Sequence, residues 1–238
     1  MNKIISSRRN LNGPILQFGS SLIEVMISLS IGLFLLTGLA VLFLSNRQVF
    51  ITQSGLAQLQ NNPAIAMNII SNVVQSAGYY TNPQTQTQIA SLSTQTVTAP
   101  LSVGFTAGQA VFGGSVNASD SIAVRSVGAM NCTGGTSAAL VSSTFTVDNN
   151  NNLQCSINSQ TSQTLVSGVS SMALLYGVDP LSTGSATRYV TAANVTNWNK
   201  VVSVRVTMNF VNPLYSANQS GQSATLAFTK VIGLMGQL

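Results

Sequence analysis

The sequence predicts an α+β protein, in which a long N-terminal helix spans a membrane in its first half and packs on an antiparallel β-sheet head. An apolar run of about 20 residues follows a basic and polar leader, which is sufficient to cross a bilayer. Helical spacing of apolar residues continues beyond that run. Alternating apolar and polar residues then recur in the second half of the chain, as in half-buried strands. The 238 residues allow one membrane segment and one head of ordinary size.

Residues 1–19 have the features of a leader peptide that is cleaved before the apolar run. Lys3, Arg8 and Arg9 come first, and the small residues of "FGSS" stand directly ahead of the run. A secretory signal peptide loses its apolar region on cleavage, whereas a cut after Gly19 would leave a membrane segment of about residues 22–45 on the mature chain. The basic residues predict a cytoplasmic N-terminus, with the head across the membrane.

These N-terminal residues resemble the type IV prepilins and related pseudopilins. Gly19 matches the last residue of their leader, and Leu22, Ile23 and Glu24 match the Leu-Ile-Glu core of their mature N-terminus. Ser20 stands where the family usually has Phe, a departure that bears on processing and on methylation. The resemblance implies cleavage by prepilin peptidase between Gly19 and Ser20 and an assembly role for the Leu-Ile-Glu core. No cofactor is predicted.

Glu24 is the one charged residue at the head of the apolar run. Its spacing from Ser20 places the carboxylate one helical turn from the new N-terminal amine. In a filament, Glu24 could pair with the amine of a neighbouring subunit, which offsets the cost of a buried charge and sets the assembly register. Before assembly it could reach membrane lipid headgroups. The alternative is a charge that only marks the membrane edge.

The helix is predicted to continue beyond the membrane as an amphipathic segment over about residues 46–78. Apolar residues recur there at spacings of three and four: Leu56, Leu59, Ala66, Ile70, Val73 and Ala77. Because Pro63 lacks an amide hydrogen, we expect a kink or a restart of the helix at residues 61–63. Gly78 is a reasonable stop, so the long helix is assigned to residues 20–80.

The stretch "AMNIISNVVQSAGYY" resembles the PilW minor pilins, whose N-terminal helix typically ends in Ala-Gly-Tyr, here Ala77, Gly78 and Tyr79. Four later segments also resemble the head of that family: residues 119–125, 165–179, 188–195 and 198–208. The resemblance implies a subunit that primes or caps a type IV pilus. Its implied partners are prepilin peptidase, other minor pilins, the major pilin and the inner-membrane assembly machinery.

Residues 81–238 form the predicted β-rich head. The low-complexity stretch 81–100 reads as an exposed loop with room for one short strand. In Val202–Phe210 every second residue is apolar, which predicts a half-buried strand. Four further strands are expected at Ile122–Val127, Thr144–Val147, Met172–Tyr176 and Ala224–Ile232.

The two cysteines, Cys132 and Cys155, predict a disulfide in an exported head. The polar segment between them fits a strand, an Asn-rich turn and a second strand, so the bridge could tie a hairpin. The alternatives are two free thiols or a metal site, and the absence of histidine argues against the metal site.

Composition argues against an enzyme and against a nucleic-acid-binding protein. The chain has no His, one Glu and three Asp, which leaves few groups for acid and base chemistry. The stretch 177–185 offers Asp179 as its only acid, so a turn is favoured over a calcium site. Loss of the leader would leave six scattered basic residues against four acidic ones, which argues against direct nucleic-acid binding.

The sequence therefore predicts a minor pilin, held in the inner membrane by one helix with its head in the periplasm and later assembled into an extracellular pilus. The pilus would serve motility, adhesion or DNA uptake. One alternative is a minor pseudopilin of a type II secretion system. Another is a tip-located adhesin that uses the polar loops at residues 81–118 and 148–164.

Overall fold

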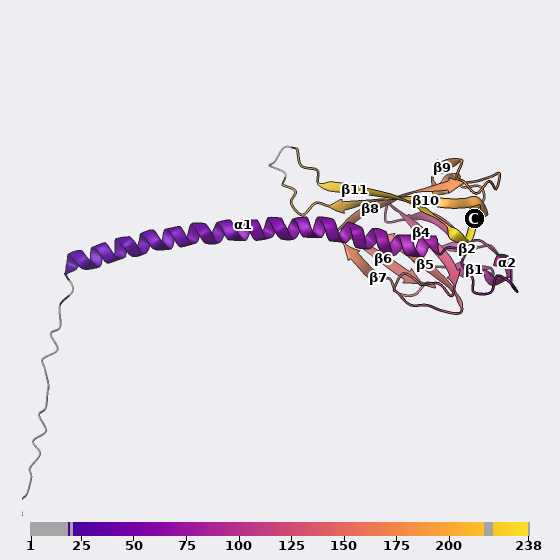
Figure 1. The fold of residues 1–238 in the computed structure, drawn as a ribbon, viewed down its shortest axis with the longest axis horizontal. Helices are drawn as coiled ribbons and strands as arrows, with labels where there is room; N and C mark the ends of the chain where they lie inside the picture. Colours follow the sequence, from indigo (N-terminus) through magenta and orange to yellow (C-terminus); the bar gives the residue numbers. More distant parts are fainter. Residues whose placement is uncertain (1–18, 20, 217–220, 238) are drawn as a thin grey trace, which may run out of the picture. The chain divides into compact units, whose positions relative to one another are not determined.

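The computed structural model describes residues 19, 21–216 and 221–237 (Figure 1). The predicted leader residues 1–18 and the predicted processing residue Ser20 lie outside the described residues. The chain divides into two compact units, residues 1–51 and 52–238, and each is described by itself.

The predicted long N-terminal helix is confirmed as α1 (Leu22–Gln75), which begins in the first unit and ends in the second. By length and composition it contains a stretch that could cross a membrane. Ser30 and Thr37 are hydroxyl residues in that stretch, and each donates a 2.8 Å hydrogen bond to the carbonyl four residues earlier. Their hydroxyl groups are therefore compatible with an apolar surrounding, because the helix itself satisfies them.

The last turns of α1 contribute a buried apolar stripe to the second unit, formed by Ala66, Met67, Ile70, Val73 and Val74. The expected restart of the helix at residues 61–63 is wrong, because α1 continues through Pro63. Pro63 is buried, and the neighbouring Asn62 donates its side-chain amide to the carbonyl of Ser167 at 3.0 Å. Tertiary contacts therefore stabilise the helix at residues 61–63, where the local sequence disfavours a continuous helix.

The second unit is built from three antiparallel sheets, which confirms the predicted α+β class but divides the single expected sheet into several. The first has five strands in chain order: β3 (Val111–Val116), β4 (Ser119–Val127), β5 (Leu140–Val147), β6 (Asn152–Ile157) and β7 (Gln163–Ser167). The second has four strands in the order β11 (Thr225–Gly233), β10 (Val201–Val211), β8 (Val169–Val178) and β9 (Arg188–Val190). The third pairs β1 (Gln95–Val97) with β2 (Val103–Phe105).

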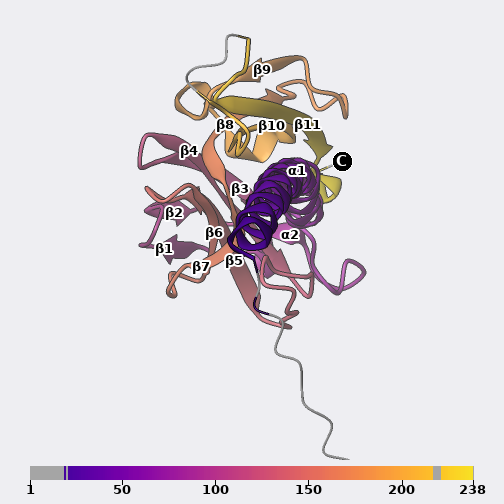
Figure 2. The same cartoon turned by 90° about the vertical axis from the view of Figure 1, so that its left-hand side faces the viewer.

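All five strands that the sequence indicated are present, as β4, β5, β8, β10 and β11. The alternation in β10 is correct from Val204 onward, since Val204, Val206 and Met208 are fully buried while Thr207 and Asn209 are only partly covered. Ser203, expected on the polar face, is buried. The two larger sheets and the end of α1 share one apolar core. In the ribbon both sheets lie beside this helix (Figure 2). The head is thus organised around the helix, as the apolar stripe on the helix requires.

The stretch 81–100 is more ordered than an exposed loop. It forms the short helix α2 (Gln88–Ser91), where the Thr87 hydroxyl accepts a hydrogen bond from the backbone N–H of Ala90 at 3.3 Å. It then forms β1, and its Leu92 and Val97 side chains are buried. The prediction of an exposed loop rested on the many polar residues in this stretch. Burial of only two apolar side chains is enough to order it, although its other side chains are polar.

Cys132 and Cys155 form a disulfide with a Cα–Cα separation of 6.3 Å. The expected hairpin is present as β5 and β6, which pair Phe145 with Cys155, but the bridge does not join its two strands. Cys132 lies instead in the loop between β4 and β5, so the disulfide ties that loop to β6. By chain entropy, closing the loop contributes about 3 kcal/mol to the stability of the head.

The Asn-rich turn between β5 and β6 is organised by Asp148. Its Oδ1 accepts hydrogen bonds from the backbone N–H groups of Asn150 (2.9 Å) and Asn152 (2.8 Å). Its Oδ2 accepts from the side-chain amides of Asn152 (3.0 Å) and Gln154 (2.7 Å). The side-chain bond from Asn152 is the largest contribution, and together these bonds lower the pKa of Asp148 below its ordinary value of 3.8.

We expect this turn to weaken in acid. Because the pKa is lower in the folded state, Asp148 stabilises the fold above about pH 4, and this contribution is lost as the pH falls through the folded pKa. Urea unfolding between pH 6 and pH 2.5 should therefore show a smaller loss of stability in Asp148→Asn than in the wild type. Equal losses in the two proteins would contradict the prediction.

Candidate functional site

The predicted assembly residues lie in the first turn of α1, in the first unit. Leu22, Ile23 and Glu24 are all exposed, and Gly19, just before the helix, is exposed as well. The backbone N–H of Glu24 donates to the carbonyl of Ser21 at 2.9 Å, so the carboxylate belongs to the turn where the free N–H groups of the helix point. A negative charge at this end is favourable to the helix dipole. The processing and assembly roles of these residues remain predictions.

The Ala-Gly-Tyr sequence forms the junction between α1 and the head. Gly78 adopts φ +80°, a left-handed conformation that ends the helix and that favours glycine. Its N–H donates to the carbonyl of Arg125 at 2.9 Å, and the N–H of Val127 donates to the carbonyl of Tyr79 at 2.8 Å. The chain therefore pairs with β4 directly after leaving the helix.

The C-terminal segment closes on the same junction from the other side. In η3 (Met235–Gln237), Gly236 packs on the backbone of Ala77 and Gly78, where a Cβ atom at position 236 would come within 2.5 Å of the Ala77 carbonyl oxygen. The preceding residue Leu234 is fully buried, and its N–H donates to the carbonyl of Val202 at 2.9 Å. Only a residue without a side chain allows this approach.

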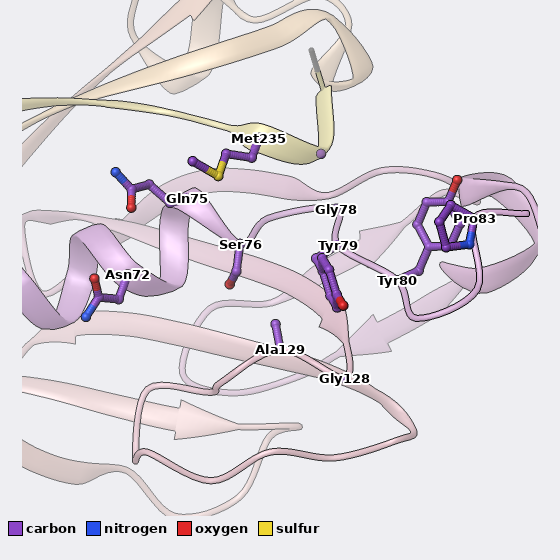
Figure 3. Close-up of a pocket in the computed structure, with 11 residues that line it drawn as sticks. Asn72, Gln75, Ser76, Gly78, Tyr79, Tyr80, Pro83, Gly128, Ala129 and Met235 are labelled. Carbon is purple, nitrogen blue, oxygen red and sulfur yellow. The ribbon is translucent and has the colours of Figure 1, made fainter.

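A cavity of about 530 Å³ opens at this junction (Figure 3). It is lined by the end of α1 (Asn72, Gln75, Ser76), the following segment (Gly78, Tyr79, Tyr80, Pro83), the residues after β4 (Gly128, Ala129) and η3 (Met235, Gly236). These lining residues include no carboxylate, ammonium or guanidinium group. Tyr79 is 49% exposed and Met235 71% exposed, so large apolar surfaces stand at the rim. Such a site is suited to packing rather than to chemistry.

Arg125 lies on β4, the strand that pairs with the Ala-Gly-Tyr segment, and connects this strand to residues 93–109. Its guanidinium is fully buried and donates to three backbone carbonyls: Nε to Gln109 (2.9 Å), Nη1 to Ser93 (2.6 Å) and Nη2 to Thr106 (2.8 Å). The group also lies over the Phe105 ring, 4.4 Å from its centroid. Burial lowers the pKa of Arg125 to about 10, so the side chain keeps its charge at neutral pH. One side chain thus fastens the segment 93–109 to β4.

Asp179 in the stretch 177–185 acts as a turn acceptor. Its Oδ2 accepts from the N–H of Gly184 at 2.7 Å and its Oδ1 from the hydroxyl of Thr183 at 3.2 Å. Burial acts to raise the pKa of Asp179, but hydrogen bonds from these residues outweigh it and leave the pKa below its ordinary value. Within the described residues, no group of three His, Cys, Asp or Glu side chains gathers to hold a metal ion.

Sequence reasoning found the Ala-Gly-Tyr junction but not the cavity or the role of Arg125. The cavity depends on Met235 and Gly236, which are remote in sequence and carry no local signal. Arg125 ends the segment 119–125, which resembles the head of the PilW minor pilins. An arginine within an apolar strand is the sequence signal for it, because a buried charge requires hydrogen-bond partners.

One comparison with known protein families finds a match. The family model for Type IV Pilus-assembly protein W matches residues 129–231, from the loop after β4 to β11. This confirms the resemblance to the PilW minor pilins over most of the head. Among curated proteins, no sequence matches this chain.

Proposed function

Because residues 129–231 match the family model for Type IV Pilus-assembly protein W, we propose that the chain is a minor pilin that is cleaved after Gly19 and primes or caps the filament. It contributes in this way to pilus-dependent motility, adhesion or DNA uptake, and it has no enzymatic activity of its own. Before assembly it lies in the inner membrane with its head in the periplasm. Its partners are prepilin peptidase, the other minor pilins, the major pilin and the inner-membrane assembly machinery.

The observation that carries the proposal is that one chain combines two features. These are α1, which is long and apolar enough to cross a membrane, and a head that matches the family model for Type IV Pilus-assembly protein W. Between Leu22 and Leu44 the helix exposes apolar side chains on all sides, with Glu24 alone carrying charge. Such a surface requires either lipid or other apolar helices around it. A filament core made of bundled helices provides the second environment after the membrane has provided the first.

The mechanism that follows is one of packing. The exposed apolar side chains of α1 exchange lipid contacts for contacts with helices of neighbouring subunits, and the heads tile the outside of the filament. Glu24 sets the axial register by pairing with the N-terminal amine of another subunit. The same leader and architecture would serve a minor pseudopilin of a type II secretion system, and the family match favours the pilus.

The proposal is tested by the N-terminal mass of the protein from membranes and from sheared filaments. We expect a mature chain that begins at Ser20, and loss of cleavage in Gly19→Ala because prepilin peptidase cuts after this glycine. Gly32→Ala is the matched control, since a Cβ atom at position 32 meets nothing within 4 Å. A chain that begins at Met1, or one cut beyond Leu44, would overturn the proposal.

A further inference from the structure

A second cavity, of about 380 Å³, lies at the edge strand β3, away from the Ala-Gly-Tyr junction. It is lined by Phe112, Gly113, Gly114, Ser115 and Asp120 from β3 and β4, and by Thr191, Ala192, Ala193 and Trp198 from the segment of η1 (Ala192–Asn194) and η2 (Trp198–Lys200). Ser115, Thr191 and Ala193 are exposed at its rim, whereas Phe112, Asp120 and Trp198 are partly buried. The cavity therefore has aromatic and acidic walls, and its exposed rim carries small side chains.

The aromatic walls are held in place before any ligand binds. The Trp198 ring lies 4.9 Å from the Phe112 ring, centroid to centroid, and 4.9 Å from the Tyr176 ring in an edge-to-face arrangement. Tyr176 is fully buried, and its hydroxyl lies against Gly113, where a side chain would overlap it. Binding would therefore cost little ordering of the walls.

Asp120 supplies a negative charge that nothing in the described part of the chain neutralises. Its Oδ2 accepts a hydrogen bond from the backbone N–H of Leu174 at 2.7 Å, which fixes the orientation of the carboxylate. No ion pair with a lysine or arginine accompanies it among the residues described, and none of the residues that line the cavity is basic. A partly buried carboxylate beside aromatic rings attracts cations, because the ring faces and the carboxylate are both negative.

We propose that this cavity binds an alkylammonium group such as a lysine side chain, with Asp120 as the counter-ion and the Trp198 and Phe112 rings packed against the alkyl chain and the ammonium. The aromatic rings suit the methylene groups and the carboxylate suits the charge. The size of the cavity suits a single side chain rather than a folded segment. The proposal does not depend on the pilus assignment, so its failure would leave that assignment intact.

Trp198 is the only tryptophan of the chain, so tryptophan fluorescence reports on the surroundings of this one residue, which lines the cavity. The full chain in detergent micelles is titrated with Nα-acetyl-lysine methylamide, and with Nα-acetyl-norleucine methylamide as the neutral probe of similar shape. We expect a saturable change in Trp198 emission with the lysine probe and at least tenfold weaker binding of the norleucine probe. Butylamine should also saturate: equal affinity would indicate free amines as ligands, and weaker affinity a side chain within a peptide.

The matched variants are Asp120→Asn and Asp148→Asn. Asp120→Asn should lower the affinity for the lysine probe at least tenfold, although the amide oxygen of the asparagine can still accept the hydrogen bond from the N–H of Leu174. The second removes a carboxylate outside the cavity and should leave binding unchanged. Equal affinity of the lysine and norleucine probes, wild-type affinity in Asp120→Asn, or no saturation by the lysine probe would overturn the proposal. If Asp120→Asn does not fold, the affinities of the wild type for the lysine and norleucine probes still test whether the cavity selects the ammonium group.

Discussion

Replacing Arg125 with leucine should destabilise the head by about 3–5 kcal/mol, which is among the largest effects of a single substitution. Leucine fills much of the volume but leaves the carbonyls of Ser93, Thr106 and Gln109 without their donors. Each buried acceptor that loses its partner costs about 1–3 kcal/mol. The segment 93–109 would also lose its attachment to β4, which receives the end of α1.

Urea unfolding of the full chain in detergent, followed by Trp198 fluorescence, measures this loss. Arg205→Leu is the matched control on β10, since Arg205 is only partly buried and lies 5.2 Å from the centroid of the Tyr189 ring. It should cost about 1 kcal/mol or less. Arg125→Lys should fall between the two, because an ammonium cannot reproduce the planar fork of the guanidinium. A loss in Arg125→Leu no larger than in the control would show that the three carbonyls find other donors.

Glu24→Val should abolish incorporation into filaments while leaving the protein processed and membrane-inserted. Valine fits the apolar surroundings of α1 better than glutamate does, so insertion has no reason to fail. In the filament, however, the N-terminal amine of the neighbouring subunit would lose its counter-ion. An unpaired buried charge costs about 3–5 kcal/mol, which corresponds to a loss of more than a hundredfold in assembly.

The amount of the chain in sheared filaments, relative to membranes, measures this effect. Glu24→Asp keeps the charge on a shorter side chain and should assemble better than Glu24→Val. Glu24→Gln removes the charge at nearly constant shape and should fail as Glu24→Val does. Recovery of Glu24→Val in filaments at the wild-type level would mean that Glu24 only marks the membrane edge.

Elements with a strong period of their own could be predicted from the sequence. The apolar run and the stripe after it gave α1, and strict alternation gave β10 with nearly the correct ends. The short strand β9 was not predicted, and β1 was expected only as one short strand somewhere in residues 81–100, because three residues carry no usable period. The expected restart of the helix at Pro63 was wrong, because it considered only the local helix-breaking tendency of proline. The packing that overrides this tendency comes from residues far along the chain.

The same distinction applies to the candidate sites. Gly19, Glu24 and the Ala-Gly-Tyr sequence are contiguous patterns and could be recognised. The aromatic cavity joins Asp120 to Trp198, which only the folding of β3 and β4 against the segment 191–200 brings together. Sites assembled from separate segments require the tertiary structure, because no single stretch contains their pattern.

The packing of η3 on the end of α1 makes completion of the head depend on segments that are far apart along the chain. Ile232 and Leu234 belong to the same apolar core as Ile70 and Val74. Gly236 then packs on the backbone at the end of the helix. Contacts across so many residues form slowly, because a long loop must close first. A chain truncated before Ile232 would therefore keep apolar surface exposed at this core, and proteases recognise such surface.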